Sequence, residues 1–208
     1  MQNPWLTIPI ADYEAHMASA PITQAQMLAS QFESALKRYQ PKSVAVFGCA
    51  GGNGFERIDR GITQRIVAID INADYVEICR ERFASCFSKL EMLVADVQSP
   101  SLNFDPVDLI YAGLIFEYTD AETVIKNASR LLTKNGKLVS VLQLPDSGEK
   151  NVSRSAYESL GALEAHMHLV SPKALCDIAE QNRFTQTTSM EITLASTRKF
   201  QLQTFQKL

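Results

Sequence analysis

Short β-branched runs alternate with helical patterns from residue 43 onward, and this alternation constrains the fold more than any other feature of the chain. The runs cover residues 44–47, 65–69, 90–94, 107–111 and 137–142. Helical patterns lie between them at 53–60, 73–87 and 120–133, with room for a shorter one at 97–104. Buried strands that alternate with helices form βαβ units, whose parallel strands are covered on both faces. The pattern therefore predicts an α/β, doubly wound core.

The chain after residue 145 predicts two more helices and a closing hairpin. A helical pattern covers residues 156–163, and a second helix begins at Ser171, an N-cap residue that Pro172 follows. Apolar and polar residues then alternate through 184–194 and 199–206, as they do in half-buried strands. We therefore expect the chain to end in an antiparallel pair of strands.

The first 40 residues predict a helical extension in front of the alternating pattern. Residues 1–22 contain three prolines and the only tryptophan, and they predict an irregular segment with a short helical piece outside the core. Thr23, with Gln26 three residues later, matches a capping box, and apolar residues then recur at helical spacing until a proline ends the run. We expect residues 1–40 to form an extension, a candidate lid, on a main domain of residues 41–208.

Composition and charge exclude several classes of protein. The 208 residues include 23 acidic and 20 basic side chains, a net charge of −3 that does not favour a nucleic acid or an anionic membrane as partner. The longest apolar stretch, 109–116, is far shorter than the ~20 residues of a membrane-spanning helix. The N-terminus has no basic and apolar signal region. We expect a cytoplasmic protein with reduced cysteines, and no metal site, because its three histidines lack metal-ligand spacing.

A glycine-rich turn, G-C-A-G-G-N-G at residues 48–54, follows the first predicted strand and precedes a helical pattern. Such a turn exposes backbone N–H groups and the positive end of a helix dipole, so it can hold a nucleotide-type ligand. A dinucleotide fingerprint that begins at Gly48 would need glycine at Ala50 and Asn53. A phosphate-binding loop would need Gly-Lys followed by Ser or Thr, which is absent here. The spacing therefore disfavours a pyrophosphate ligand.

Two acidic residues end the second and third predicted strands. Asp70 lies 22 residues after Gly48, where a carboxylate can accept hydrogen bonds from both hydroxyls of a ribose. Asp96 ends the third strand, and the carboxyl ends of parallel strands line one crevice. The alternative is that both acids cap the helices that follow them, although Asn72 and Ser99 could do so instead.

The ordered series of motifs resembles the class I S-adenosylmethionine-dependent methyltransferases over about residues 41–206. The motifs are V-A-V-F-G-C-A-G-G-N-G, V-A-I-D, L-V-A-D-V, V-D-L-I-Y-A-G and L-L-T-K-N-G-K-L-V-S-V. Ala50 departs from the commonest G-x-G-x-G turn, in which the middle position is glycine. The resemblance implies a Rossmann-like, mostly parallel sheet of seven strands with a C-terminal antiparallel hairpin, which agrees with the alternation after residue 184.

The resemblance also implies a set of cofactor-binding residues. They are Gly48, Cys49, Ala50, Gly51, Gly52, Asp70, Ile71, Asp96, Val97, Ala112 and Gly113. The turn would pass under the methionyl and ribose parts of S-adenosylmethionine, Asp70 would bind the ribose hydroxyls, and Asp96 would accept from the adenine amino group. The residue after each acid would contact the adenine ring. The end of the fourth strand would lie near the reactive sulfonium.

Three residues are candidates for a general base, which an unactivated hydroxyl acceptor would need within hydrogen-bond distance. Glu117 follows the fourth strand on the ligand side, although it could simply begin the next helix as an acidic residue. His16 lies in the N-terminal segment, which could cover the cofactor with Tyr13 and Met17 or could pack only on the outside of the sheet. His166 is the third candidate, although a histidine in a loop is more often a surface residue.

The acceptor is constrained by what the chain lacks. Similar enzymes that methylate the amino groups of nucleic-acid bases carry an Asn/Asp-Pro-Pro-Tyr/Phe motif after the fourth strand, and this chain has Tyr-Ala-Gly-Leu there. We therefore expect a small organic acceptor. Two alternatives stay open: a nicotinamide-dependent oxidoreductase, which Asp70 would serve equally well, and a methyltransferase-like module that binds the cofactor without catalysis. The sequence does not indicate the oligomeric state.

Overall fold

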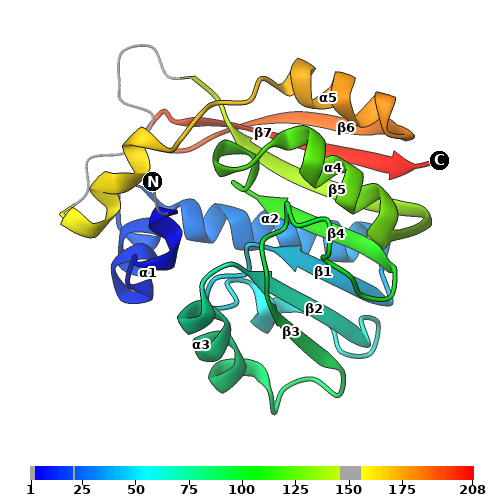
Figure 1. Cartoon of the computed structure of the whole chain (residues 1–208), viewed down its shortest axis with the longest axis horizontal. Coiled ribbons are helices and arrows are strands. Elements are labelled where there is room, and N and C mark those ends of the chain that lie inside the picture. Colours follow the sequence, from blue (N-terminus) through cyan, green and yellow to red (C-terminus); the bar gives the residue numbers. More distant parts are fainter. Residues whose placement is uncertain (1–2, 21, 146–155) are drawn as a thin grey trace.

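A seven-stranded sheet forms the centre of the computed structural model, which describes residues 3–20, 22–145 and 156–208 (Figure 1). Its order is β3-β2-β1-β4-β5-β7-β6. The strands are β1 (Ser43–Phe47), β2 (Arg65–Asp70), β3 (Leu90–Val94), β4 (Val107–Gly113), β5 (Leu132–Gln143), β6 (Phe184–Thr193) and β7 (Lys199–Lys207). The first five are parallel, and β7 pairs antiparallel with both β5 and β6. The predicted α/β architecture, with its C-terminal hairpin, is confirmed.

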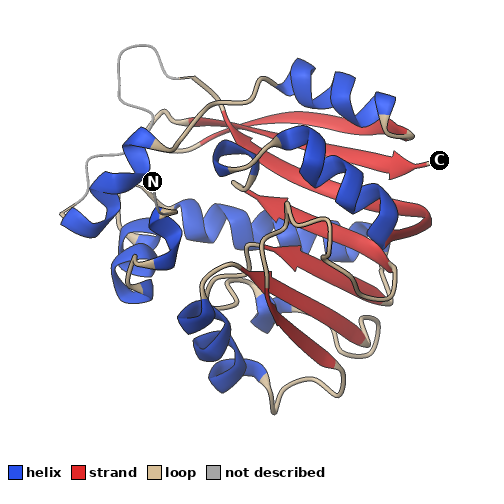
Figure 2. Ribbon diagram, viewed as in Figure 1, coloured by secondary structure: helices blue, strands red, loops and turns tan. Residues whose placement is uncertain are grey.

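Helices cover both faces of the sheet in the described part of the chain (Figure 2). The α-helices are α1 (Ile10–Ala18), α2 (Gln24–Tyr39), α3 (Ala73–Phe83), α4 (Ala121–Leu131) and α5 (Pro172–Gln181). Short 3-10 helices occupy Pro4–Leu6, Phe55–Arg57, Phe116–Tyr118 and Glu158–Ala165. Figure 1 shows that α1 and the 158–165 helix lie at the same end of the sheet.

Strand β1 shows why its run is continuously apolar. Ala45 and Phe47 pack in the core cluster that α4 and α5 cover, whereas Val44 and Val46 pack in the cluster that α2 and α3 cover. Successive side chains of a strand point to opposite faces, and both faces are buried here, so every position of the strand favours an apolar residue.

Three predicted helices differ from the structure. Residues 53–60 form only the 3-10 turn Phe55–Arg57, because the chain enters it through Gly52 and Gly54 in the left-handed conformation. Residues 97–104 are not helical. There the Asp96 carboxylate accepts from the backbone N–H of Gln98 and closes a local turn instead. The pattern at 156–163 forms the 3-10 helix Glu158–Ala165.

The N-terminal predictions need two corrections. The capping box is wrong: Thr23 has a left-handed backbone and makes no side-chain cap, and Gln26 donates to the carbonyl of Ala18 instead. The prediction that the first 22 residues lie outside the core is also wrong, because Ile8 and Met17 are only 3% and 7% exposed. The Gln26–Ala18 hydrogen bond and the burial of Ile8 and Met17 depend on parts of the chain outside the local helical repeat, so periodicity could not indicate them.

The strand order reverses at β1, which pairs in parallel with β2 on one side and with β4 on the other. The chain leaves these three strands in different directions at their carboxyl ends, which opens a crevice between the loops. Ligands of open α/β sheets bind at such a switch point. The predicted glycine turn, Asp70 and Gly113 all lie at this end of the sheet.

Candidate functional site

The glycine turn after β1 is held in a left-handed backbone conformation. Gly48, Ala50 and Gly52 have φ values of 71°, 44° and 86°. The N–H groups of Gly48 and Cys49 both donate to the carbonyl of Ile69 at 2.9 Å, which ties the turn to the end of β2. A Cβ atom at Gly52 would lie 2.6 Å from the Phe83 ring. Conformation and space therefore both require glycine at this position.

Asp70 joins the end of β2 to this turn. Its side chain is buried, and its two carboxylate oxygens accept from the backbone N–H of Ala50 at 2.9 Å and of Asn72 at 3.0 Å. Burial raises the pKa of Asp70, and the N–H groups of Asn72, Ala50 and Ile71 oppose that rise. An ionised carboxylate offers about four acceptor positions, so the backbone contacts leave capacity for a ligand hydroxyl.

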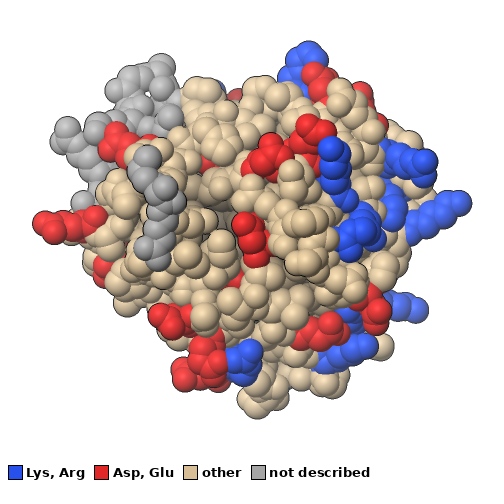
Figure 3. Space-filling model, viewed as in Figure 1, with Lys and Arg blue, Asp and Glu red and all other residues tan. Residues whose placement is uncertain are grey.

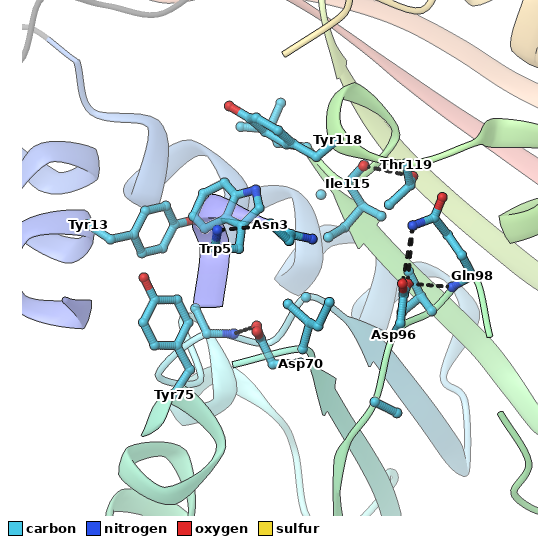
Figure 4. A pocket seen from close by; sticks show the side chains of 17 residues that line it. Asn3, Trp5, Tyr13, Asp70, Tyr75, Asp96, Gln98, Ile115, Tyr118 and Thr119 are labelled. Carbon is cyan, nitrogen blue, oxygen red and sulfur yellow. Dashed lines mark hydrogen bonds between the residues drawn. The ribbon is translucent and has the colours of Figure 1, made fainter. Parts of the chain in front are cut away.

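Asp96 and Gln98 form a second polar pair on the opposite wall of the crevice (Figure 4). One Asp96 oxygen accepts from the Gln98 backbone N–H at 2.8 Å and from its side-chain amide at 3.2 Å. The side-chain amide oxygen of Gln98 accepts in turn from the backbone N–H of Asp120. Gln98 was not among the predicted site residues, because no motif distinguishes it from an ordinary loop residue.

The alternative that the two acids serve as helix caps is wrong for both. Asn72 caps α3 with its side-chain oxygen, which accepts from the N–H groups of Asp74 and Tyr75. No helix lies between Asp96 and the start of β4. Both carboxylates instead line the same crevice.

The first cavity lies at this crevice and has about 670 Å³ of empty space, part of it open to solvent. Seven of the predicted cofactor-binding residues line it: Gly48, Ala50, Asp70, Ile71, Asp96, Val97 and Gly113. Figure 3 shows acidic side chains beside the hollow near the middle of this face, while Lys and Arg gather toward the right side of the view.

The N-terminal segment builds an aromatic wall of the first cavity. The Trp5 ring meets Tyr13 edge-on at 5.5 Å between centroids and Tyr118 at 5.0 Å (Figure 4). The side-chain N–H of Asn72 donates to the Trp5 carbonyl at 2.8 Å. Tyr13 was predicted as part of a cover of the cofactor, whereas Trp5 and Tyr118 were not predicted as site residues. The only sequence signal for Trp5 is that it is the single tryptophan, in an irregular N-terminal segment.

A third cavity lies behind the glycine turn and takes the other predicted turn residues, Cys49, Gly51 and Gly52, in its lining. Arg82 of α3 crosses this region and pairs with Glu14 of α1, with 3.0 Å between Arg82 Nη2 and Glu14 Oε2. Ala112 corrects the prediction: its side chain is packed in the core cluster under α4, and it lines none of the three cavities described here.

The second cavity adjoins the first across Trp5, Tyr13, Leu114 and Tyr118, which line both. It contains two of the three predicted base candidates, Glu117 and His16. The third candidate, His166, contacts the carbonyl of Ala162 in its own segment and lines none of the three cavities.

Glu117 is fully buried at the edge of the second cavity. One carboxylate oxygen accepts from the backbone N–H of Gln143 at 2.6 Å, and the other has no hydrogen-bond partner among the described residues. Burial raises the pKa of Glu117 to about 7, and the Gln143 contact opposes that rise. Burial and the charge of Arg198 both lower the pKa of His16, which favours its neutral form.

The described residues contain no helix long and apolar enough to cross a membrane. Within 3–20, 22–145 and 156–208, no three His, Cys, Asp or Glu side chains are grouped as metal ligands. All four cysteines are free thiols.

Comparison with known proteins finds a sequence match over part of the chain and similar folds over nearly all of it. Residues 44–136 match the family described as a methyltransferase domain. The chain is 23% identical over 138 residues to an uncharacterized methyltransferase of Schizosaccharomyces pombe, a match that covers 66% of this chain and 52% of that protein. The chain thus spans about half the length of this curated relative.

Two solved structures share the fold over nearly the whole chain. The N-methyltransferase NodS of Bradyrhizobium japonicum, in complex with S-adenosylhomocysteine, superposes with a TM-score of 0.75 and 14% identity over 99% of both chains. The magnesium protoporphyrin IX methyltransferase of Synechocystis has a TM-score of 0.73 and 10% identity, over 98% of this chain and 96% of that one. At such identities the likeness concerns the fold.

The fold and the crevice at its switch point define a Rossmann-like domain with a nucleotide-type site. The family match covers the glycine turn, both acids and the end of β4. The match to a methyltransferase domain agrees with the resemblance to the class I S-adenosylmethionine-dependent methyltransferases, and it disfavours a nicotinamide-dependent oxidoreductase.

Proposed function

We propose that this protein transfers a methyl group from S-adenosylmethionine, bound in the first cavity, to a small organic acceptor bound in the second. The observation that carries the proposal is the convergence of the glycine turn, Asp70 and Asp96 on one cavity at the sheet's switch point. The methyltransferase family match over residues 44–136 supports the same cofactor.

The lining of the first cavity suits the parts of this cofactor. We assign the ribose hydroxyls to Asp70, whose buried carboxylate keeps unused acceptor capacity. The adenine ring would lie between Ile71 and Val97, with its amino group toward Asp96. The methionine part would follow the glycine turn toward Gly113, which also lines the third cavity.

Fold relatives support a small acceptor. One is a magnesium protoporphyrin IX methyltransferase, and another is a geranyl diphosphate methyltransferase solved in complex with GPP and sinefungin. The second has a TM-score of 0.69 and 14% identity over 95% of this chain. The second cavity is lined by aromatic and apolar side chains together with Glu117 and His16, which suits a small organic acceptor.

Positioning accounts for much of the proposed catalysis. When bound, S-adenosylmethionine supplies an electrophilic methyl group on a sulfonium. Trp5, Tyr13 and Tyr118 line both cavities and would orient donor and acceptor in direct contact where the cavities meet, while they exclude water. Holding two reactants in line can lower the activation barrier by ~7–11 kcal/mol.

Calorimetric titration tests the proposal. We expect S-adenosylhomocysteine to bind the wild-type protein and NAD not to bind. Asp70→Asn keeps an acceptor for the backbone but loses the charge, and should weaken binding about 10- to 100-fold, since each hydrogen bond to a charged group contributes about 1.5–3 kcal/mol. Asp74→Asn, four residues further on in the exposed first turn of α3, is the matched control. Failure of the wild-type protein to bind S-adenosylhomocysteine would refute the proposed function.

A further inference from the structure

The second cavity combines a buried acid with aromatic rings, and this combination suggests a class of acceptor. Its wall toward the first cavity consists largely of Trp5, Tyr13 and Tyr118. Leu160 and Met167 close it from the side of the 158–165 helix. Ser159 of that helix donates to Asp12 of α1 at 2.6 Å, so the two elements that enclose the cavity are tied to each other.

One polar group in this cavity lacks a partner. Glu117 is 0% exposed, and its Oε2 atom makes no hydrogen bond among the described residues, while Oε1 is held by the N–H of Gln143. A buried polar atom without a partner costs about 1–3 kcal/mol. A ligand that donates a hydrogen bond to Oε2 would remove that cost, so the site favours a donor at this position.

The other ionisable groups of the cavity set limits on the ligand. His16 is buried, and the neighbouring positive charge of Arg198 favours its neutral form. Arg198 is itself buried and engaged in an interaction of its own. Tyr13 and Tyr118 stay neutral because burial raises the pKa of each phenol. Glu117 has a free oxygen, and because burial raises its pKa to about 7 it can accept a proton near neutral pH.

We propose that the acceptor is a small amine whose nitrogen donates to Glu117 Oε2 beside the Trp5, Tyr13 and Tyr118 rings, and that Glu117 is the base of the reaction. Aromatic faces attract ammonium groups, and a carboxylate beside them adds to the attraction. A neutral hydroxyl acceptor would gain the hydrogen bond but not the attraction to the rings. This inference rests on the proposed methyltransferase function.

The proposed step balances in atoms and charge. The bound ammonium loses one proton to Glu117 Oε2, which frees the nitrogen lone pair. That pair forms the bond to the transferred methyl carbon while the carbon–sulfur bond breaks, and its electrons stay on sulfur. The positive charge moves from sulfur to the methylated nitrogen. Glu117 then returns its proton to solvent.

A pair of probes tests the inference in protein saturated with S-adenosylhomocysteine. Benzylamine and benzyl alcohol have the same shape and differ in charge, and their binding is measured by calorimetry. We expect the wild-type protein to bind benzylamine at least tenfold more tightly. Glu117→Gln should lose most of this preference, because the amide keeps the contact with Gln143 but has no charge and no basicity, and only the attraction to the rings is left.

The control is Glu158→Gln, the same change at an exposed residue near the cavity, which should keep the wild-type preference. Retained binding of S-adenosylhomocysteine shows that Glu117→Gln is folded. Equal affinity for the two probes in the wild type, no binding of either, or a preference that is undiminished in Glu117→Gln would each overturn the inference. These outcomes leave the proposed function standing, because that function fails only if S-adenosylhomocysteine itself does not bind.

Discussion

The residues of the glycine turn act through backbone geometry more than through their side chains. Gly52 combines a φ of 86° with a ring that fills the space of any Cβ. Ala50 adopts a φ of 44°, so the alanine that departs from the usual motif holds a conformation that glycine adopts at lower cost. Its N–H donates to Asp70, which compensates for part of that strain.

Gly52→Ala should lower the free energy of unfolding by about 1–3 kcal/mol, because the new methyl group meets the Phe83 ring and the left-handed backbone disfavours alanine. Urea denaturation followed by circular dichroism measures the change. Gly161→Ala is the control, because its Cβ would meet nothing within 4 Å. Equal stabilities of the two variants would contradict the geometry described for the turn.

Trp5 provides an optical signal for the first cavity, because it is the only tryptophan and lines that cavity. Binding of S-adenosylhomocysteine should change its fluorescence intensity or emission maximum in a saturable manner. Trp5→Phe keeps an aromatic ring and should abolish the signal while calorimetry still detects binding. A titration without any change in emission would mean that the ligand does not reach the ring.

At the scale of elements, the N-terminal segment depends on contacts with distant parts of the chain. Asn72 caps α3 through its oxygen and holds Trp5 through its nitrogen, and Arg82 of α3 pairs with Glu14 of α1. Asn72, at the start of α3, therefore contacts both Asp70 at the end of β2 and Trp5 in the lining of the first cavity. We propose that residues 1–40 act as a cover of the site.

Asn72→Asp separates the two roles of this side chain. The aspartate oxygen still caps α3, but the buried carboxylate then meets the Trp5 carbonyl without a donor, so stability should fall by about 1–3 kcal/mol through this contact alone. The donor to the Trp5 carbonyl is lost, so affinity for S-adenosylhomocysteine should fall several-fold. Asn72→Ala, which removes both contacts, should lower stability and affinity together. Unchanged affinity in Asn72→Asp would show that the Trp5 contact does not shape the cavity.

Local pattern predicted the strands and the acids at their ends, because a strand buried on both faces is a continuous apolar run and its last residue is easy to locate. It did not predict the single 3-10 turn at Phe55–Arg57 or the burial of Ile8, since these depend on backbone strain and on packing against remote segments. Gln98 and the partners of Glu117 were missed for the same reason: their neighbours come from other loops.

At the scale of the whole molecule, a buried acid couples stability to pH. The pKa of Glu117 is about 7 in the folded state and 4.5 without burial, so the folded protein holds this proton more tightly. Stability from this group is present below pH 4.5 and is lost as the pH rises to 7. The loss is on the order of 3 kcal/mol.

Glu117→Gln should remove that dependence, because glutamine does not titrate. The free energy of unfolding of the variant, relative to wild type, should therefore rise between pH 4.5 and 7.5, measured by urea denaturation at several pH values. Asp70, whose pKa burial also raises, is present in both proteins and cancels in the comparison. A constant difference across the range would contradict the burial described for Glu117.

A crystal structure of the complex with S-adenosylhomocysteine tests the central claim most directly. The account predicts the ribose hydroxyls within hydrogen-bond distance of Asp70 and the adenine ring between Ile71 and Val97. We also expect the sulfur near Gly113, facing the junction of the first and second cavities that Trp5, Tyr13 and Tyr118 line. A ligand bound elsewhere, or one whose ribose does not contact Asp70, would contradict it.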